Sequence, residues 1–370
     1  MTQLTPNTNK IGERLFSLDF FRGLTMFLLV AEATHIYSLM AAPELEGSVI
    51  FTIGTQFHHH PWNGLRFWDL IQPFFMFIVG VAIPYSFANR TKRGQTYNQI
   101  LRHTIQRSVI LLFLGWSLYN IGAGKIGFHF QNVLAQLSVT YLLAFLMMNK
   151  PARTQIIFSL LLLVITELIY RFFPVEGFNQ PFVADKNFGT WLDMQYGGAD
   201  FSGHWVSFNA IPTTAHTMWG VLAGQLLRSS RTNMQKLKIL LIAGIIGVVA
   251  GYALNPFTPI IKRICTSSFI LASGGWTILA LAFSFWLIDI MKQKNWSLFF
   301  AIVGMNPLFI YLFANVGGAG FVEHIIHPYA MLLFGWTGEA MANVLTALVV
   351  VFLLWYICYW LYKKKIFIRI

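Results

Sequence analysis

Long continuous runs of hydrophobic residues, separated by short polar segments, make up most of this chain. Each run has roughly 18 to 22 residues, the length an α-helix needs to cross a bilayer core of about 30 Å. The runs do not alternate between apolar and polar positions, which disfavours membrane-spanning strands. We therefore predict an all-α, polytopic integral membrane protein of about ten transmembrane helices. The predicted spans are residues 17–37, 69–87, 108–124, 132–148, 154–173, 210–227, 239–254, 267–290, 297–316 and 342–362.

Composition agrees with this class of protein. Of the 370 residues, 56% are hydrophobic and only 11% are charged, too few charges to cover the surface of a soluble protein of this length. We find no added soluble domain, so residues 1–370 are predicted to form a single transmembrane domain. Asp19 and Arg22 interrupt the first run, which argues against a cleavable signal. The stretch 324–336 is interpreted as a short interfacial or re-entrant segment.

Basic residues predict the orientation. With a cytoplasmic N-terminus, 19 of the 26 lysines and arginines fall in cytoplasmic segments, among them Lys10, Arg14 and Arg369. Six fall on the opposite side: Arg66, Lys125, Arg171, Lys186, Lys262 and Arg263. The positive-inside rule then places both termini in the cytoplasm, and we expect a bacterial inner (plasma) membrane. The net charge of +12 follows from this asymmetry and from attraction to lipid headgroups, and it does not indicate nucleic-acid binding.

A triplet of histidines at residues 58–60 lies in the first external loop of this topology, just before the second span. The long segment 174–209, the short segment around Lys262 and residues 317–341 are predicted on the same side. Residues 174–209 are rich in aromatic and polar side chains. That composition suits a lid or a sugar platform, because aromatic faces stack on sugar rings, and it equally suits an interfacial aromatic belt.

Charged groups inside the predicted spans need a reason, because placing them in lipid is costly. Asp19 and Arg22 are three residues apart on one helical face and can form an ion pair at the cytoplasmic border. Alternatively, a phosphorylated ligand that enters from the cytoplasm is bound by Arg22 together with Arg90, Lys92 and Arg93. Glu32 lies deeper in the first span, and we favour a wet cavity around it.

Further polar residues have two interpretations each. Asp69 begins the second span, where a carboxylate is favourable at a helix N-terminus, so capping explains it as well as chemistry does. His216, Asn306 and Asn315 either line a shared pathway or join neighbouring helices. Pro307 is expected to break its span locally.

The first two runs carry a family resemblance. The opening RLFSLDFFRGLTMFLLVAEATHIY, followed by a histidine-containing loop and WNGLRFWDLIQPFFMFIVGVAI, resembles the start of the heparan-α-glucosaminide N-acetyltransferase family. That family includes a lysosomal enzyme and bacterial relatives labelled as N-acetylglucosamine-related transporters or DUF5009. The similarity continues through NVLAQLSVTYLLAFL, GVLAGQLL, TSSFILASGGWTILALAFSFWLID and GMNPLFIYL. The opening alone is loose, since other membrane acyltransferases share something like it, but in combination the motifs are fairly specific.

The resemblance implies transmembrane acetylation. In this family acetyl-CoA binds from the cytosol, and its acetyl group reaches an amino sugar or glycan on the opposite face. The active histidine of the family stands three residues before the Trp of its Trp-Asn/His-Gly motif, which corresponds to His59 here. His58 and His60 flank this position, so a shift by one residue stays open. The family also implies a homodimer.

General chemistry is consistent with such a histidine. The acceptor amine must lose a proton as it attacks the thioester, and an imidazole with a pKa near 6.5 can accept that proton at neutral pH. Alternatively the imidazole carries the acetyl group itself, and the sequence does not separate the two routes. Asp69 or Glu32 can fix the tautomer of the ring.

The predicted site therefore has three groups of residues and no metal. They are His59, Asp69 and Glu32 for catalysis, Arg22, Arg90, Arg93 and Asn306 for acetyl-CoA, and His58, His60, Trp62 and Asn63 for the acceptor. Three departures from the family pattern leave the acceptor and the acyl chain open. They are Glu32-Ala33 near the end of the first span, Ala135-Gln136 in the fourth, and GADFSGHWVSFN before the sixth.

Two other functions remain as alternatives. A sugar permease without acyl transfer fits the polar groups within the spans and the aromatic external segment, although no paired repeat is found. A zinc site built from His58, His60 and His204 is geometrically awkward, because adjacent residues do not readily share one ion. Cys265 and Cys358 lie far apart in the sequence and indicate neither a disulfide nor a metal framework.

Overall fold

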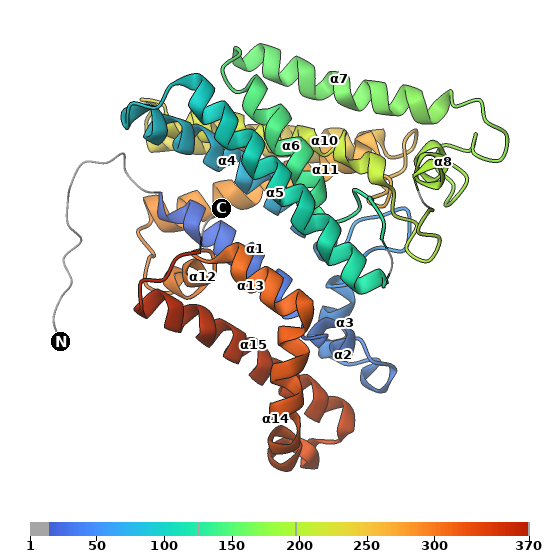
Figure 1. Cartoon of the computed structure of the whole chain (residues 1–370), viewed down its shortest axis with the longest axis vertical. Coiled ribbons are helices and arrows are strands. Elements are labelled where there is room, and N and C mark those ends of the chain that lie inside the picture. The colour runs from blue at the N-terminus through green and yellow to red at the C-terminus, as the bar shows by residue number, and fades with distance from the viewer. Residues whose placement is uncertain (1–14, 125, 197, 369–370) are drawn as a thin grey trace.

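The computed structural model describes residues 15–124, 126–196 and 198–368, and this part of the chain is built of helices (Figure 1). Lys10, Arg14, Lys125 and Arg369, which the orientation prediction uses, lie outside the described residues. The helices are α1 (Phe16–Glu32), α2 (Ile36–Met40), η1 (Pro43–Leu45), α3 (Val49–Gln56), η2 (Phe67–Leu70), α4 (Ile71–Lys92), α5 (Tyr97–Ala123), α6 (Val133–Met147), α7 (Ala152–Arg171), α8 (Phe188–Gln195), η3 (Ser207–Ala210), α9 (Thr214–Arg228), α10 (Asn233–Leu254), α11 (Ser267–Ser284), η4 (Phe285–Ile290), α12 (Ser297–Val303), α13 (Pro307–Phe313), η5 (Ala314–Gly318), α14 (Ala319–Phe334), η6 (Gly335–Thr337) and α15 (Glu339–Lys363).

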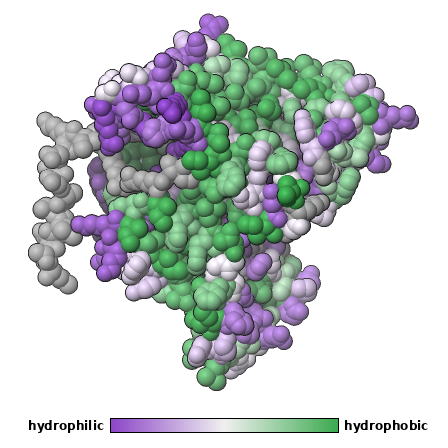
Figure 2. All heavy atoms as spheres, in the orientation of Figure 1, coloured by the Kyte–Doolittle hydropathy of each residue, from purple (hydrophilic) through white to green (hydrophobic). Residues whose placement is uncertain are grey.

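The protein is a helical integral membrane protein. Among the described residues, six helical stretches are long and apolar enough to cross a membrane: Phe67–Lys92, Ala152–Arg171, Asn233–Leu254, Ser267–Ile290, Pro307–Thr337 and Glu339–Lys363. Figure 2 shows hydrophobic residues over much of the visible face, as a lipid-facing surface requires. Each predicted span overlaps a helix, whereas the number ten and the cytoplasmic position of both termini stay predictions.

The helix boundaries differ from the predicted spans at several ends; α5, for example, begins at Tyr97 and not at residue 108. α1 ends at Glu32 and not at residue 37, because His35 adopts a left-handed backbone conformation with φ 58°. α12 ends at Val303 and α13 begins at Pro307, so the expected break at this proline is confirmed. The predicted short segment 324–336 lies mostly within the helix α14.

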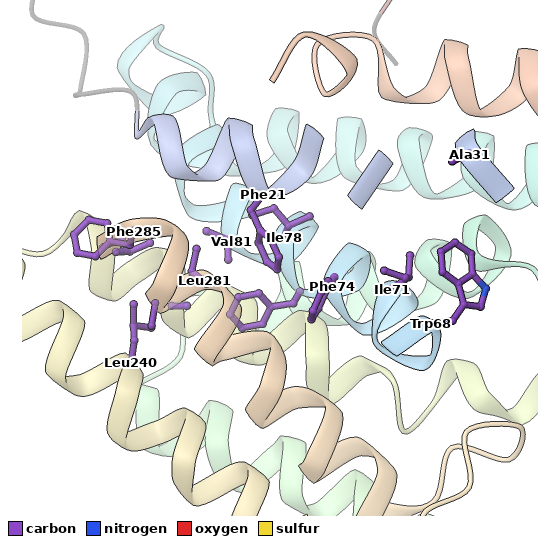
Figure 3. Packing of buried hydrophobic residues seen from close by; sticks show 14 of the residues in the cluster. Phe21, Ala31, Trp68, Ile71, Phe74, Ile78, Val81, Leu240, Leu281 and Phe285 are labelled. Atoms are coloured by element: carbon purple, nitrogen blue, oxygen red, sulfur yellow. The ribbon is translucent and has the colours of Figure 1, made fainter. Parts of the chain in front are cut away.

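One buried core joins α1, α4, α10 and α11 (Figure 3). Phe21 of α1 packs against Phe74 of α4 with ring centroids 5.1 Å apart, and Val81 of α4 belongs to the same core. Leu281 and Leu240 close the core from α11 and α10. Within a bilayer the stability of such a core comes from close van der Waals packing between helices, since lipid tails are as apolar as the side chains. The core therefore fixes α4, which follows directly on the Asp69-bearing η2 at one end and carries Arg90 near the other.

Small residues bring α4 and α9 together. A Cβ atom added to Gly220 of α9 would lie 2.1 Å from the carbonyl oxygen of Phe77 in α4. The same closeness joins α10 and α11, where a Cβ on Gly275 would lie 2.3 Å from the backbone nitrogen of Val248. Glycine is needed at both contacts because any side chain would force the helices apart.

The polar residues within the later helices form hydrogen bonds, either to a neighbouring helix or to the preceding turn of their own helix. His216 of α9 lies with its Nε2 3.0 Å from Ser273 Oγ of α11, which confirms helix joining for this residue. Asn315 donates to the carbonyl of Tyr311 one turn earlier in the same helix. Neither arrangement requires a ligand.

Candidate active site

His59 and Asp69 form the centre of the candidate site. His59 Nδ1 lies 2.9 Å from Asp69 Oδ1, and the other carboxylate oxygen accepts the backbone N–H groups of His60 at 3.1 Å and Arg66 at 2.9 Å. The Asp69 side chain is fully buried. Because an ionised carboxylate only accepts hydrogen bonds, this contact requires the ring hydrogen on Nδ1. The lone pair of His59 is therefore on Nε2.

The position of Asp69 follows from local helix capping. η2 begins after Arg66, and the Asp69 side chain accepts the Arg66 backbone N–H in a capping box. The prediction that Asp69 caps the second span is therefore confirmed. The same carboxylate also contacts His59, so capping fixes the group that orients the imidazole.

Lys262 is a member of this cluster that the sequence analysis did not select. Its Nζ lies 3.1 Å from His59 Nδ1 and 3.8 Å from Asp69 Oδ1, and its side chain is buried. One signal in the sequence pointed to it, because Lys262 is among the few basic residues predicted on the external side. A cation that departs from the positive-inside pattern needs another reason for its place.

Two loops join to bring Lys262 to the histidine. The Gly64 N–H donates to the carbonyl of Ile260 at 2.8 Å, and the Ile260 N–H donates to Asn63 Oδ1 at 3.1 Å. A backbone bridge between Asn63 and Ile261 completes the joint. Asn63, predicted to contact the acceptor, is therefore engaged in holding the two loops together.

Burial and the neighbouring cation act in the same direction on the histidine. Burial, followed by the charge of Lys262, lowers the pKa of His59 to about 4, although Asp69 opposes the change. Burial also lowers the pKa of Lys262 to about 8, and the nearby Asp69 carboxylate limits this decrease. At neutral pH the ring is therefore neutral and the lysine predominantly charged.

An indole ring from segment 174–209 borders the histidine. The Trp205 ring lies edge-on to His59, with centroids 5.0 Å apart and an interplanar angle of 73°, and the Arg263 guanidinium lies 5.1 Å from the Trp205 ring centre. Asp193 accepts the Ser207 backbone N–H at 3.0 and 3.2 Å, which fixes the chain just after Trp205. The sequence placed the histidine loop, segment 174–209, the Lys262 segment and residues 317–341 on one side of the membrane, which stays a prediction. The structure brings the first three into contact. α14 of segment 317–341 lies well apart from α8 (Figure 1).

The residues flanking His59 are engaged in loop contacts. His58 Nε2 lies 3.2 Å from a backbone carbonyl of α2, and the His60 ring packs against Gly64, where an added Cβ would lie 2.5 Å from His60 Nε2. Trp62 Nε1 donates to the carbonyl of Phe182 at 2.8 Å. Of the triplet, His59 is the residue whose ring contacts Asp69. Contact of His58, His60 and Trp62 with an acceptor stays a prediction.

A second histidine–aspartate pair lies in segment 174–209. His204 Nδ1 is 2.7 Å from Asp185 Oδ2, and the His204 ring lies edge-on to Trp62 at 6.0 Å between centroids. Within the described ranges, no group of three or more His, Cys, Asp or Glu side chains is arranged to hold a metal ion. The zinc alternative therefore has no support from the arrangement of its three histidines.

Glu32 occupies a different position from the one proposed for tautomer control. Its Oε1 accepts a hydrogen bond from Trp68 Nε1 at 3.0 Å, so it neighbours the segment that carries Asp69. The contact with the imidazole of His59 comes from Asp69 and not from Glu32. Its charge lies within electrostatic range of Lys262.

A cavity of about 600 Å³ lies between α1, α4, α5, α6 and α13. Arg22, Ser86 and Arg107 line one part of it, and Leu29 and Phe75 line another. Figure 2 shows a hollow at the upper left, with hydrophilic residues on its rim and hydrophobic ones within. The cavity therefore combines cationic groups with a long apolar lining.

The predicted acetyl-CoA residues lie at different distances from this cavity. Arg22 pairs with Asp19 at 2.8 Å, as predicted, and also lines the cavity. Arg90 lines an adjoining pocket of about 190 Å³, which shares Arg107 with the larger one. Arg93 is exposed at the end of α4. Arg107 was not selected from the sequence, because an arginine near a predicted span border has no distinguishing pattern.

Asn306 binds the C-terminal segment, which forms part of the cavity wall. Its Nδ2 donates to the carbonyl of Ile366 at 3.0 Å, and its Oδ1 accepts the backbone N–H of Ile368 at 2.7 Å. Phe367 and Ile368 line the cavity wall, whereas Asn306 does not. Asn306 therefore holds the wall in place, and direct contact with acetyl-CoA stays a prediction.

Comparison with known proteins agrees with the family resemblance. Residues 14–187 match the family model described as a domain of unknown function, DUF5009. Heparan-alpha-glucosaminide N-acetyltransferase from Mus musculus is 29% identical over 146 residues, which cover 37% of this chain and 19% of that protein. The Homo sapiens protein of the same name is 29% identical over 137 residues, covering 35% of this chain and 18% of that protein. The chain thus spans about a fifth of the length of these relatives, and the comparisons together confirm the resemblance to the heparan-α-glucosaminide N-acetyltransferase family.

Proposed function

We propose that this protein is a membrane acetyltransferase, which moves the acetyl group of acetyl-CoA to an amine on the other side of the bilayer. The observation that carries the proposal is the His59–Asp69 contact of 2.9 Å, which leaves Nε2 of a neutral imidazole as a base or nucleophile. The acceptor class that we favour is an amino sugar or glycan. Support for this class comes from the resemblance to proteins with that activity in their names.

The donor is proposed to bind in the cavity of about 600 Å³. Arginine binds phosphate through two parallel charge-assisted hydrogen bonds, so Arg22 and Arg107 suit the nucleotide phosphates of acetyl-CoA. Arg90, in the adjoining pocket, can extend this contact. The apolar lining suits the thin chain that carries the thioester.

The proposed acetyl-CoA cavity and His59 lie in succession along the direction of α4. The cavity follows α4 from Ser86 to Phe75, a distance of roughly 16 Å at the usual helical rise. Asp69 lies about 10 Å further along the same element, by the same rise. A thioester at the Phe75 end would therefore need to cross less than two helical turns to approach His59.

Two routes are chemically balanced. In the direct route, the amine nitrogen attacks the thioester carbonyl, His59 Nε2 accepts the amine proton, the C–S bond breaks, and CoA leaves as the thiol after taking up a proton. In the two-step route, Nε2 itself attacks the thioester carbonyl, the C–S bond breaks, and CoA leaves as the thiol after taking up a proton. The amine then attacks the acetyl group, the bond to Nε2 breaks, and the freed Nε2 accepts the amine proton. In both routes Asp69 holds Nδ1–H and stabilises the positive charge that develops on the imidazole.

The acceptor is proposed to approach from segment 174–209. Trp205 borders His59, and Trp62 and His204 continue the same wall. Indole faces suit the apolar face of a sugar ring, and the dyad with Asp185 fixes the His204 tautomer for a hydroxyl contact. We therefore propose that these side chains form the acceptor site next to His59.

The test uses purified protein in lipid vesicles with acetyl-CoA and a hexosamine. We expect CoA release only when the hexosamine is present, and loss of release in His59→Ala. His58→Ala is the matched control and should retain most of the activity. Uptake of the hexosamine without CoA release would support the sugar permease alternative and contradict the acetyltransferase. Full activity in His59→Ala would remove this histidine from the mechanism.

A further inference from the structure

Lys262 is a buried cation next to the imidazole of the proposed reaction, and the family motif does not contain it. We propose that Lys262 is a positioning residue for His59. Its ammonium group opposes protonation of the ring and so keeps it neutral beside Asp69, while Asp69 holds the hydrogen on Nδ1 and leaves a bare lone pair on Nε2. This inference rests on the proposed function only for its use in catalysis. The protonation state itself can be tested without any acetyl transfer.

The geometry around His59 Nδ1 determines which of the two ring nitrogens carries the hydrogen. Nδ1 faces two groups, Asp69 Oδ1 at 2.9 Å and Lys262 Nζ at 3.1 Å. A ring hydrogen on Nδ1 can be donated to the carboxylate but not to an ammonium, which has no lone pair. Lys262 also lies 3.8 Å from Asp69 Oδ1, so it attracts the same carboxylate. The lysine therefore contributes a positive charge beside a ring nitrogen that already carries a hydrogen.

That charge opposes a second proton on the ring. A histidine beside a single carboxylate normally becomes easier to protonate, as the Asp69 contact alone would make it. Lys262 offsets this effect because imidazolium and ammonium repel each other at this distance. Burial and Lys262 together outweigh Asp69 and lower the pKa of His59 to about 4. The result is an imidazole that stays unprotonated through mildly acidic conditions.

Other charged groups face the cluster from neighbouring elements. Arg263 follows Lys262 and adds a second cation that lowers the pKa of His59. Arg66 Nη1 donates to the His59 backbone carbonyl at 3.2 Å, so its charge also lies close. On the negative side, Glu32 acts on Lys262 and favours its charged form. Lys262 is the cation in contact with the ring nitrogen, which singles it out among the three.

The joint between the two loops explains why Lys262 is buried beside His59. The two loops are joined through the backbone between Asn63 and Ile261, directly before Lys262, so this joint fixes the lysine beside the ring. A lysine that served only to balance Asp69 would not need contact with His59. Its place 3.1 Å from Nδ1 makes the imidazole the group it acts on.

The experiment measures reaction of His59 with diethyl pyrocarbonate, which modifies the neutral imidazole. Modification rates of the peptide containing residues 58–60 are followed by tandem mass spectrometry between about pH 4 and 8, with a histidine peptide as the reference near pH 6.5. In the wild-type protein we expect the His59 midpoint well below that of the reference. In Lys262→Met we expect it to rise by roughly one to three pH units, the usual effect of a charge at this distance. Lys262→Arg keeps the charge and should hold the midpoint near the wild-type value.

Lys186→Met is the matched control, because Lys186 is exposed and belongs to the same predicted face. It should leave the midpoint unchanged. A wild-type midpoint at or above the reference would overturn the proposal, as would an unchanged midpoint in Lys262→Met. If Lys262→Met does not fold, Lys262→Gln takes its place, and the wild-type comparison remains decisive. Because no step uses acetyl-CoA, a negative result here leaves the acetyltransferase proposal standing, and failure of CoA release leaves this one standing.

Discussion

At the scale of single residues, the candidate site depends on which hydrogen each ring nitrogen carries. Asp69 is buried and accepts from His59 Nδ1 and from two backbone N–H groups. Its oxygens are thus held by the backbone as well as by the ring. The tautomer of His59 is therefore determined by the loop that surrounds Asp69, and not by His59 alone.

Replacing Asp69 by Asn tests this dependence. An amide can donate to Nδ1, which would move the ring hydrogen to Nε2 and remove the lone pair required for transfer. We expect CoA release to fall by about 10³-fold or more, as in other histidine–aspartate sites. Asp185→Asn changes the pair with His204 in the same way. It should have a much smaller effect on turnover, and any effect should be on KM. Equal losses in both variants would contradict the assignment of Asp69.

The low pKa of His59 also has a consequence for stability. Unfolded chains protonate histidine near pH 6.5, whereas the folded protein does so near pH 4. Below about pH 6.5 the unfolded state thus binds more protons, so the free energy of unfolding falls as the pH falls toward 4. We expect Tm in detergent to decrease over this interval more steeply in the wild-type protein than in His59→Gln. Parallel Tm curves would contradict the low pKa.

At the scale of elements, close helix contacts place the site. α4 follows directly on η2, which contains Asp69, and lines the cavity from Phe75 to Ser86, so the position of α4 against α9 affects both. This contact depends on Gly220, because a side chain there would meet the backbone of Phe77. Composition alone does not predict such a contact, because glycine occurs throughout the chain.

Gly220→Ala is expected to destabilise the protein. The added Cβ would lie 2.1 Å from the Phe77 carbonyl oxygen, so the helices must separate, at a cost of about 1–3 kcal/mol for overpacking. Gly320→Ala in α14 is the matched control, since no atom lies within 4 Å of its added Cβ. There we expect an unchanged or slightly raised Tm, because alanine favours a helix. Similar Tm values for both variants would contradict the packing argument.

At the scale of the whole molecule, the cavity and the histidine–aspartate contact lie in succession along α4 and the segment before it, and the predicted orientation assigns them to opposite sides of the membrane. The cavity with Arg22 and Arg107 runs along α4 from Ser86 to Phe75, and the loops with His59, Trp205 and Lys262 meet beyond the first residue of this helix. This arrangement suits a donor and an acceptor that arrive from opposite sides. The single domain over residues 1–370, the bacterial inner membrane and the homodimer stay predictions.

Cysteine labelling tests the orientation. Cys265 and Cys358 are both buried, so background reaction with a membrane-impermeant maleimide should be low. We expect Lys186→Cys in intact cells to react from outside, and Arg93→Cys to react only after the membrane is opened. Both side chains are exposed in the folded protein. The reverse pattern would place the termini outside.

The sequence by itself determined the helical membrane class, because continuous apolar runs can satisfy their backbone groups in lipid only as helices. It also determined the break at Pro307, the Asp19–Arg22 pair and the family resemblance, since these depend on residues close in the chain. Only the tertiary structure decided that Lys262 joins a histidine 203 residues away, that Asp69 and not Glu32 contacts it, and that Asn306 holds a wall of the cavity. These contacts arise from loop pairing and helix packing, which bring together residues that no local pattern links.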